Sequence, residues 1–143
     1  MSQILEKRAM YKEEENIKVG NILVVEDDHI DTLVVKALLE KHFNLQIVQT
    51  GPEAIKLMDE IVFDIVLADI NLGDENMDGV KLMKTIRENK KHDNIKVFAV
   101  TSYYENRNFF LEQGFDELLT KPVIKEEILD ILNASIKTNS QIA

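Results

Sequence analysis

Three runs of mainly apolar residues, rich in β-branched side chains, constrain the fold of this chain more than any other feature. They lie at residues 21–25, 63–68 and 95–100. Strands that are buried on both faces of a parallel sheet have this pattern, whereas strands with one solvated face alternate apolar and polar residues. We therefore expect three central strands of a parallel sheet that is covered by helices on both faces.

Helical patterns alternate with these strands. Apolar residues recur with the spacing of a helix in five segments, at residues 30–39, 50–58, 80–86, 109–114 and 128–136. Asp28 or Asp31 could cap the first helix. Two shorter apolar runs, 45–48 and 117–119, are candidate strands between the helices. The order is a β-α unit repeated five times, which predicts an α/β domain with a doubly wound parallel sheet and right-handed crossovers.

Polar side chains stand where the strands end. Glu26 and Asp27 follow the first strand, Asp69 ends the third, Thr101 and Ser102 follow the fourth, and Lys121 and Pro122 follow the last. Taken singly, such residues are most often helix caps or turn residues. The carboxyl ends of parallel strands meet at one edge of a sheet, however, and ligands bind there. We therefore expect these groups to converge on one site.

The chemistry of these groups favours a divalent cation. Crowded carboxylates repel one another, and oxygen donors without His or Cys point to Mg²⁺ or Mn²⁺ rather than zinc. An Asp beside such an ion can act as a nucleophile toward a phosphoryl donor. The metal, the Lys121 ammonium and the Thr101 hydroxyl would then neutralise the transferred group.

Composition excludes several classes of protein. The net charge of −9 argues against direct contact with nucleic acid, and the absence of cysteine excludes disulfides and thiolate metal sites. No apolar run approaches the roughly 20 residues that span a bilayer, and the N-terminus lacks the features of a signal peptide, so we expect a cytoplasmic protein without membrane insertion. Residues 1–20 are predicted to be a partly helical or flexible extension, 21–137 the domain, and 138–143 a polar tail.

The motifs together resemble one known family. Residues 22–28, 64–69, 78–79, 100–102 and 119–122 look like those of the receiver domain of two-component response regulators. The resemblance covers about residues 20–137. It implies a flavodoxin-like (βα)5 fold with strand order 2-1-3-4-5. It also implies a signalling module that catalyses only its own phosphorylation and slow dephosphorylation, rather than an enzyme that turns over a substrate.

The resemblance also implies roles for individual residues. Asp69 would be the phosphoacceptor, and Glu26 and Asp27 would supply the acidic pair that holds Mg²⁺ or Mn²⁺, together with Asp69 and the backbone carbonyl of Asn71. Thr101 would sense the phosphoryl group and Lys121 would pair with it, with a cis peptide bond before Pro122. The donor would be a histidine kinase or a histidine phosphotransfer protein. The downstream partner is not implied, and a homodimer is possible.

The sequence departs from the family pattern at the expected switch. Leu118 stands three residues before Lys121, where the family usually has Tyr or Phe. Ser102 and Tyr103 follow Thr101, and the side chain at Tyr103, like that at Asn71, is expected to tune the lifetime of the phosphoryl group. The stretch from Thr101 to Lys121 is about two residues shorter than in the family, and the loop 71–77 is longer and lacks proline.

Three alternatives follow from the same residues. Residues 74–79 match the first half of an EF-hand calcium loop, but the twelfth position is Thr85 instead of Glu. A phospho-Asp hydrolase would place its nucleophile on the first strand, as Asp-x-Asp, whereas here the candidate nucleophile ends the third strand. A phosphorylation-independent interaction module would be expected to lose the acceptor Asp, the Lys or the acidic pair, and all of these are present.

Overall fold

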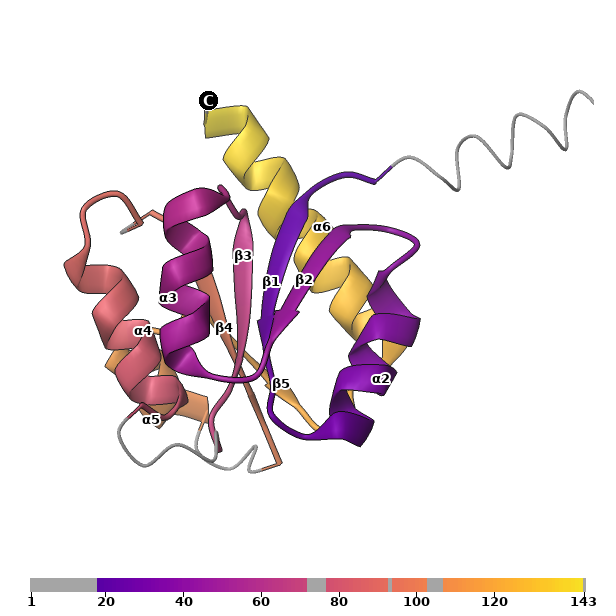
Figure 1. Ribbon diagram of the computed structural model, residues 1–143. Coiled ribbons are helices and arrows are strands. Elements are labelled where there is room, and N and C mark those ends of the chain that lie inside the picture. Colours follow the sequence, from indigo (N-terminus) through magenta and orange to yellow (C-terminus); the bar gives the residue numbers. More distant parts are fainter. Residues whose placement is uncertain (1–17, 72–76, 93, 103–106, 143) are drawn as a thin grey trace, which may run out of the picture.

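A parallel sheet with the strand order β2-β1-β3-β4-β5 forms the centre of the molecule, as the computed structural model shows (Figure 1). The structure describes residues 18–71, 77–92, 94–102 and 107–142, with side chains described as far as residue 136. Along the described chain the elements are β1 (Asn21–Val25), α2 (His29–Leu39), β2 (Asn44–Val48), α3 (Gly51–Glu60), β3 (Ile65–Asp69), α4 (Gly79–Glu88), β4 (Lys96–Thr101), α5 (Arg107–Gln113), β5 (Glu117–Thr120) and α6 (Lys125–Ile142). This is the expected doubly wound, flavodoxin-like fold.

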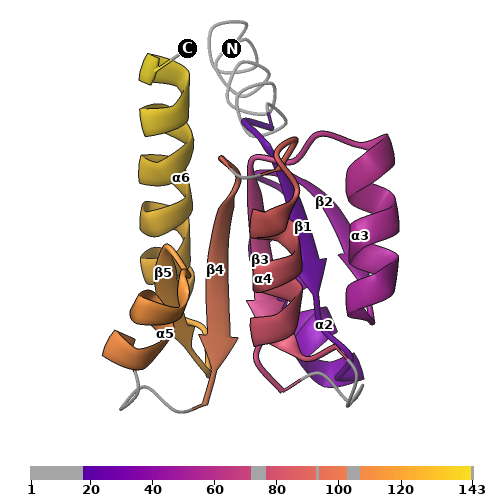
Figure 2. The same ribbon diagram turned by 90° about the vertical axis from the view of Figure 1, so that its left-hand side faces the viewer.

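Helices cover both faces of the sheet, α2 and α6 on one side and α3, α4 and α5 on the other (Figures 1 and 2). Successive side chains of a strand point to opposite faces, so each central strand contributes to both cores. On β1, Leu23 and Val25 pack with the helices α3 and α4, whereas Ile22 and Val24 pack with α2 and α6. This double burial is the physical reason for the continuous apolar runs in the sequence.

Local chemistry accounts for where several of the helices begin or end. Asp28 caps α2, because its carboxylate accepts a hydrogen bond from the backbone N–H of Asp31 at 2.9 Å. Asp78 caps α4 in the same way through the N–H of Lys81, also at 2.9 Å, so this residue of the suggested calcium loop has a structural role. Gly114 follows α5 with a φ of 123°, a conformation that side chains disfavour.

Several element boundaries differ from the sequence prediction by one or more residues. β3 begins at Ile65 rather than at residue 63, because its pairing with β1 starts there. The last helix, α6, spans Lys125–Ile142 and is longer than the helical pattern predicted over residues 128–136. Most of the predicted extension, residues 1–17, lies outside the described residues. In the described part of the chain, no helix has both the length and the apolar character needed to cross a membrane.

The first turn of α4 contacts the end of β3 without an intervening side chain. A Cβ added to Gly79 would lie 2.9 Å from the Cα of Ile70 and 3.0 Å from the carbonyl carbon of Asp69, and closer still to the carbonyl oxygen of Asp69. These neighbours are backbone atoms and cannot rotate away. Glycine at residue 79 therefore allows α4 to pack directly against the strand that carries Asp69.

We expect Gly79→Ala to lower the free energy of unfolding by about 1–3 kcal/mol, because the added methyl group overpacks a contact between backbones. Urea denaturation would measure the loss. Lys84→Ala on the exposed face of the same helix is the control, with an expected change within about 0.5 kcal/mol. Equal stabilities for Gly79→Ala and the wild-type protein would show that the backbone contact tolerates a Cβ.

Candidate functional site

The register of the parallel strands brings the predicted residues to one edge of the sheet. Val25 pairs with Ala68, so Glu26 and Asp69 follow at neighbouring strand ends. Thr101 pairs with Thr120, and the backbone N–H of Lys121 donates to the carbonyl oxygen of Thr101 at 2.8 Å. The expected convergence of these groups at the carboxyl ends of the strands is present in the structure.

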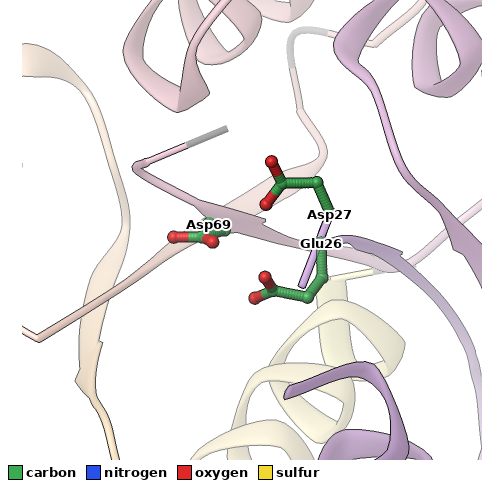
Figure 3. Close-up of side chains that lie close together, drawn as sticks. All are labelled: Glu26, Asp27 and Asp69. Atoms are coloured by element: carbon green, nitrogen blue, oxygen red, sulfur yellow. The ribbon is translucent and has the colours of Figure 1, made fainter. Parts of the chain in front are cut away.

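An acidic cluster lies at the ends of β1 and β3. Glu26, Asp27 and Asp69 each offer one carboxylate oxygen, and these oxygens all lie within 4.8 Å of one another (Figure 3). Glu26 and Asp69 are buried, with 3% and 5% of their surface exposed, whereas Asp27 is open to solvent. A set of carboxylate oxygens with one solvent-facing member suits a hard dication that keeps some of its water.

The ammonium of Lys121 contacts three carboxylates. Its Nζ lies 2.8 Å from Asp31 Oδ2, 3.1 Å from Glu26 Oε2 and 3.3 Å from Asp69 Oδ2. Sequence reasoning placed Lys121 in the site but treated Asp31 only as a possible helix cap. The sequence pattern that could have indicated this role of Asp31 is Asp-x-x-Asp at the start of α2. Asp28 caps the helix there, so the carboxylate of Asp31 is not needed as a cap.

Burial and neighbouring charges shift the pKa values of two groups in the cluster. Burial, a hydrogen bond with Asp69 and the charge of Asp69 raise the pKa of Glu26 from 4.5 to about 7, although the backbone N–H of Asp28 and the Lys121 ammonium oppose this shift. Burial alone would lower the pKa of Lys121, but Asp31, Glu26 and Asp69 outweigh it and raise the pKa above its usual range. The carboxylate oxygens of the acidic cluster fit a bound Mg²⁺, whose positive charge would favour the ionised form of Glu26.

The remaining predicted residues lie around this cluster. The backbone N–H of Asn71 donates to Asp69 Oδ1 at 3.0 Å, which places Asn71 beside the candidate acceptor. Thr101 is buried, with 1% of its surface exposed, whereas Ser102 is exposed. The peptide bond between Lys121 and Pro122 is cis, in agreement with the resemblance. Tyr103 lies outside the described residues.

Leu118 occupies the position where the family usually has an aromatic side chain. It is 7% exposed and belongs to the apolar core on the side of α4 and α5, together with Met83, Phe110 and Phe115. A leucine that is already packed in this core has no ring to turn inward. The structure thus gives Leu118 a role in packing.

Comparison with known proteins agrees with the fold. The family model for the response regulator receiver domain matches residues 22–133. The chain therefore belongs to the family of response regulator receiver domains. It is a signalling module of two-component systems rather than a classical enzyme.

Curated relatives place similar domains in proteins of different architecture. The chain is 26% identical over 117 residues to the cell cycle transcriptional regulator CtrA of Caulobacter vibrioides, covering 81% of this chain and 50% of CtrA. It is 30% identical over 114 residues to the autoinducer 2 sensor kinase/phosphatase LuxQ of Vibrio vulnificus, covering 78% of this chain and 13% of LuxQ. The chain thus spans half of the length of one relative and a small part of the other.

A solved structure shares both the fold and a quarter of the sequence. The receiver domain of the sensor histidine kinase PA1611 of Pseudomonas aeruginosa, solved with a magnesium ion coordinated in its active site cleft, superposes with a TM-score of 0.74 at 26% identity. The match covers 82% of this chain and 98% of that domain.

The pKa of Glu26 predicts how stability depends on pH when divalent cations are absent. The pKa is higher in the folded state, about 7, than the ordinary value of 4.5. The folded state therefore binds this proton more tightly, and the resulting stabilisation is complete below pH 4.5 and is lost as the pH rises through about 7. Glu26→Gln cannot titrate, so it should gain roughly 1–3 kcal/mol relative to the wild-type protein between pH 5 and pH 8.

Urea denaturation in EDTA at the two pH values would measure this difference. Glu127→Gln on the exposed face of α6 is the matched control for the loss of one carboxylate. A stability difference for Glu26→Gln that is the same at both pH values would show that Glu26 is already ionised in the metal-free protein.

Proposed function

We propose that this domain accepts a phosphoryl group on Asp69 from the phosphohistidine of a histidine kinase or a histidine phosphotransfer protein, in a Mg²⁺-dependent reaction. The observation that carries the proposal is the position of the Asp69 carboxylate. It is buried, it belongs to the acidic cluster, and it lies 3.3 Å from the Lys121 ammonium. A carboxylate nucleophile between a cation site and a fixed ammonium has the charge balance that phosphoryl transfer needs.

Glu26, Asp27, Asp69 and the backbone carbonyl of Asn71 would hold the metal ion. When bound, Mg²⁺ supplies positive charge for the oxygens of the transferred group. The bond that forms joins a carboxylate oxygen of Asp69 to phosphorus, and the bond that breaks joins phosphorus to the imidazole nitrogen of the donor. The chain itself orients the nucleophile, because the N–H of Asn71 and the ammonium of Lys121 hold the two oxygens of Asp69.

Lys121 and Thr101 would respond to the phosphoryl group after transfer. Lys121 can pair with a phosphoryl oxygen because its ammonium already lies beside Asp69. Thr101 ends β4, next to the strand that carries Asp69, and its hydroxyl would bind the same group and draw the chain after β4 toward the site. Since Leu118 has no aromatic ring, the change would reach partners through the β4–α5 segment, with Ser102 and Tyr103 as tuning positions.

The relatives support the nature of the partners. LuxQ is named as a sensor kinase/phosphatase and CtrA as a transcriptional regulator, so similar domains occur in proteins at both ends of a signalling route. The magnesium ion in the PA1611 receiver supports the same ion here. The net charge of −9 favours protein partners over direct contact with nucleic acid.

Intact-mass measurement after incubation with acetyl phosphate and Mg²⁺ would test the proposal. We expect one phosphoryl adduct on the wild-type protein and none on Asp69→Asn or in EDTA, because the first lacks the nucleophile and the second lacks the metal. Asp130→Asn, the same chemical change on the exposed face of α6, is the matched control and should be modified like the wild-type protein.

An adduct that persists in Asp69→Asn would assign the acceptor to another residue. The absence of an adduct at early times, in a wild-type protein shown to be folded by circular dichroism, would count against phosphoryl transfer. It would favour instead an interaction module that acts without phosphorylation.

A further inference from the structure

The Lys121 ammonium has its shortest contact with a carboxylate outside the acidic cluster. We propose that Asp31 is a positioning residue that gives the Lys121 ammonium a partner outside the metal ligands and competes with the phosphoryl group for the same ammonium. The inference rests on the proposed function for its phosphoryl half. Its metal-binding half depends only on the geometry of the ion pairs.

The contact is built into the start of α2. The Asp31 carboxylate lies 2.8 Å from Lys121 Nζ, compared with 3.1 Å for Glu26 and 3.3 Å for Asp69. The backbone N–H of Asp31 is held by the capping carboxylate of Asp28, which fixes the residue in the first turn of the helix. Only 20% of the Lys121 side chain is exposed, so the ammonium has few positions other than those beside these three carboxylates.

The surroundings strengthen this ion pair. Asp31 and Lys121 line a small cavity, about 80 Å³ in volume, whose other walls include the apolar side chains of Val34, Val123 and Ile128. Attraction between opposite charges is stronger beside apolar groups than in open water. The Asp31 side chain is still 38% exposed, so water can solvate it if Lys121 pairs with a more highly charged group instead.

Asp31 should favour metal binding. Lys121 and a bound Mg²⁺ would both use Glu26 and Asp69, and their positive charges repel each other. A carboxylate outside the cluster gives the ammonium another partner while the metal ion takes the cluster oxygens. The negative charge of Asp31 also attracts the cation directly. Removal of this charge therefore weakens metal binding through both effects.

Asp31 should oppose the phosphorylated state. A phosphoryl group on Asp69 brings additional negative charge and needs the Lys121 ammonium, which must leave Asp31 or share it. The carboxylate of Asp31 both competes for the ammonium and repels the new charge. Removal of the carboxylate therefore favours the phosphorylated state. The two expected effects of one substitution have opposite directions, which a purely structural role of Asp31 would not produce.

The test compares Asp31→Asn with Asp28→Asn. Both variants remove one carboxylate from the start of α2, but Asp28 has no contact with Lys121 in the described structure, and asparagine caps a helix about as well as aspartate. Calorimetric titration with Mg²⁺ measures the first effect. Titration with beryllofluoride, an analogue of the phosphoryl group, at saturating Mg²⁺ measures the second, and thermal unfolding verifies that each variant is folded.

For Asp31→Asn we expect Mg²⁺ affinity to fall about two- to fivefold and beryllofluoride affinity to rise by a similar factor, the range that partly exposed ion pairs produce. Asp28→Asn should change each affinity less than Asp31→Asn does. Unchanged affinities in Asp31→Asn, or shifts in the same direction, would overturn the inference. A wild-type protein that binds Mg²⁺ but no beryllofluoride would overturn the proposed function and the phosphoryl half of the inference, and the Mg²⁺ titration would still decide the metal half.

Discussion

The crowding of carboxylates around one ammonium is the constraint on which the site depends. Glu26 and Asp69 are almost fully buried at the ends of apolar strands, where an unpaired charge is costly. Lys121 contacts both of them and also Asp31, so one ammonium is shared among three carboxylates. The fold therefore holds an arrangement of charge that a dication and a phosphoryl group would complete together.

The strands could be predicted because burial on both faces removes polar residues from them. This pattern located β1, β3 and β4, and hence the polar residues that follow them. The order of the strands came from the resemblance to receiver domains, because edge and central strands of this length cannot be ordered from composition alone. The start of β3 was placed two residues early because Phe63 is apolar and buried like the strand residues, although pairing with β1 begins only at Ile65.

The sequence predicted the site residues at the strand ends, but it did not predict the part of Asp31, which lies in helix α2. Strand ends meet at a common edge whatever the details of packing, so the meeting of Glu26, Asp27 and Asp69 follows from topology. The contact of Asp31 with Lys121 depends instead on how α2 is rotated about its axis against the sheet. A sequence pattern gives the apolar side of a helix but does not fix this rotation closely enough to predict an ion pair.

The bare contact between Gly79 and the end of β3 has a mechanical consequence. Backbone presses on backbone there, and no side chain can absorb a displacement by changing its rotamer. Asp69 and the first turn of α4 are thus joined by a direct contact between backbones. A shift of the Asp69 main chain would therefore displace the first turn of α4 as well.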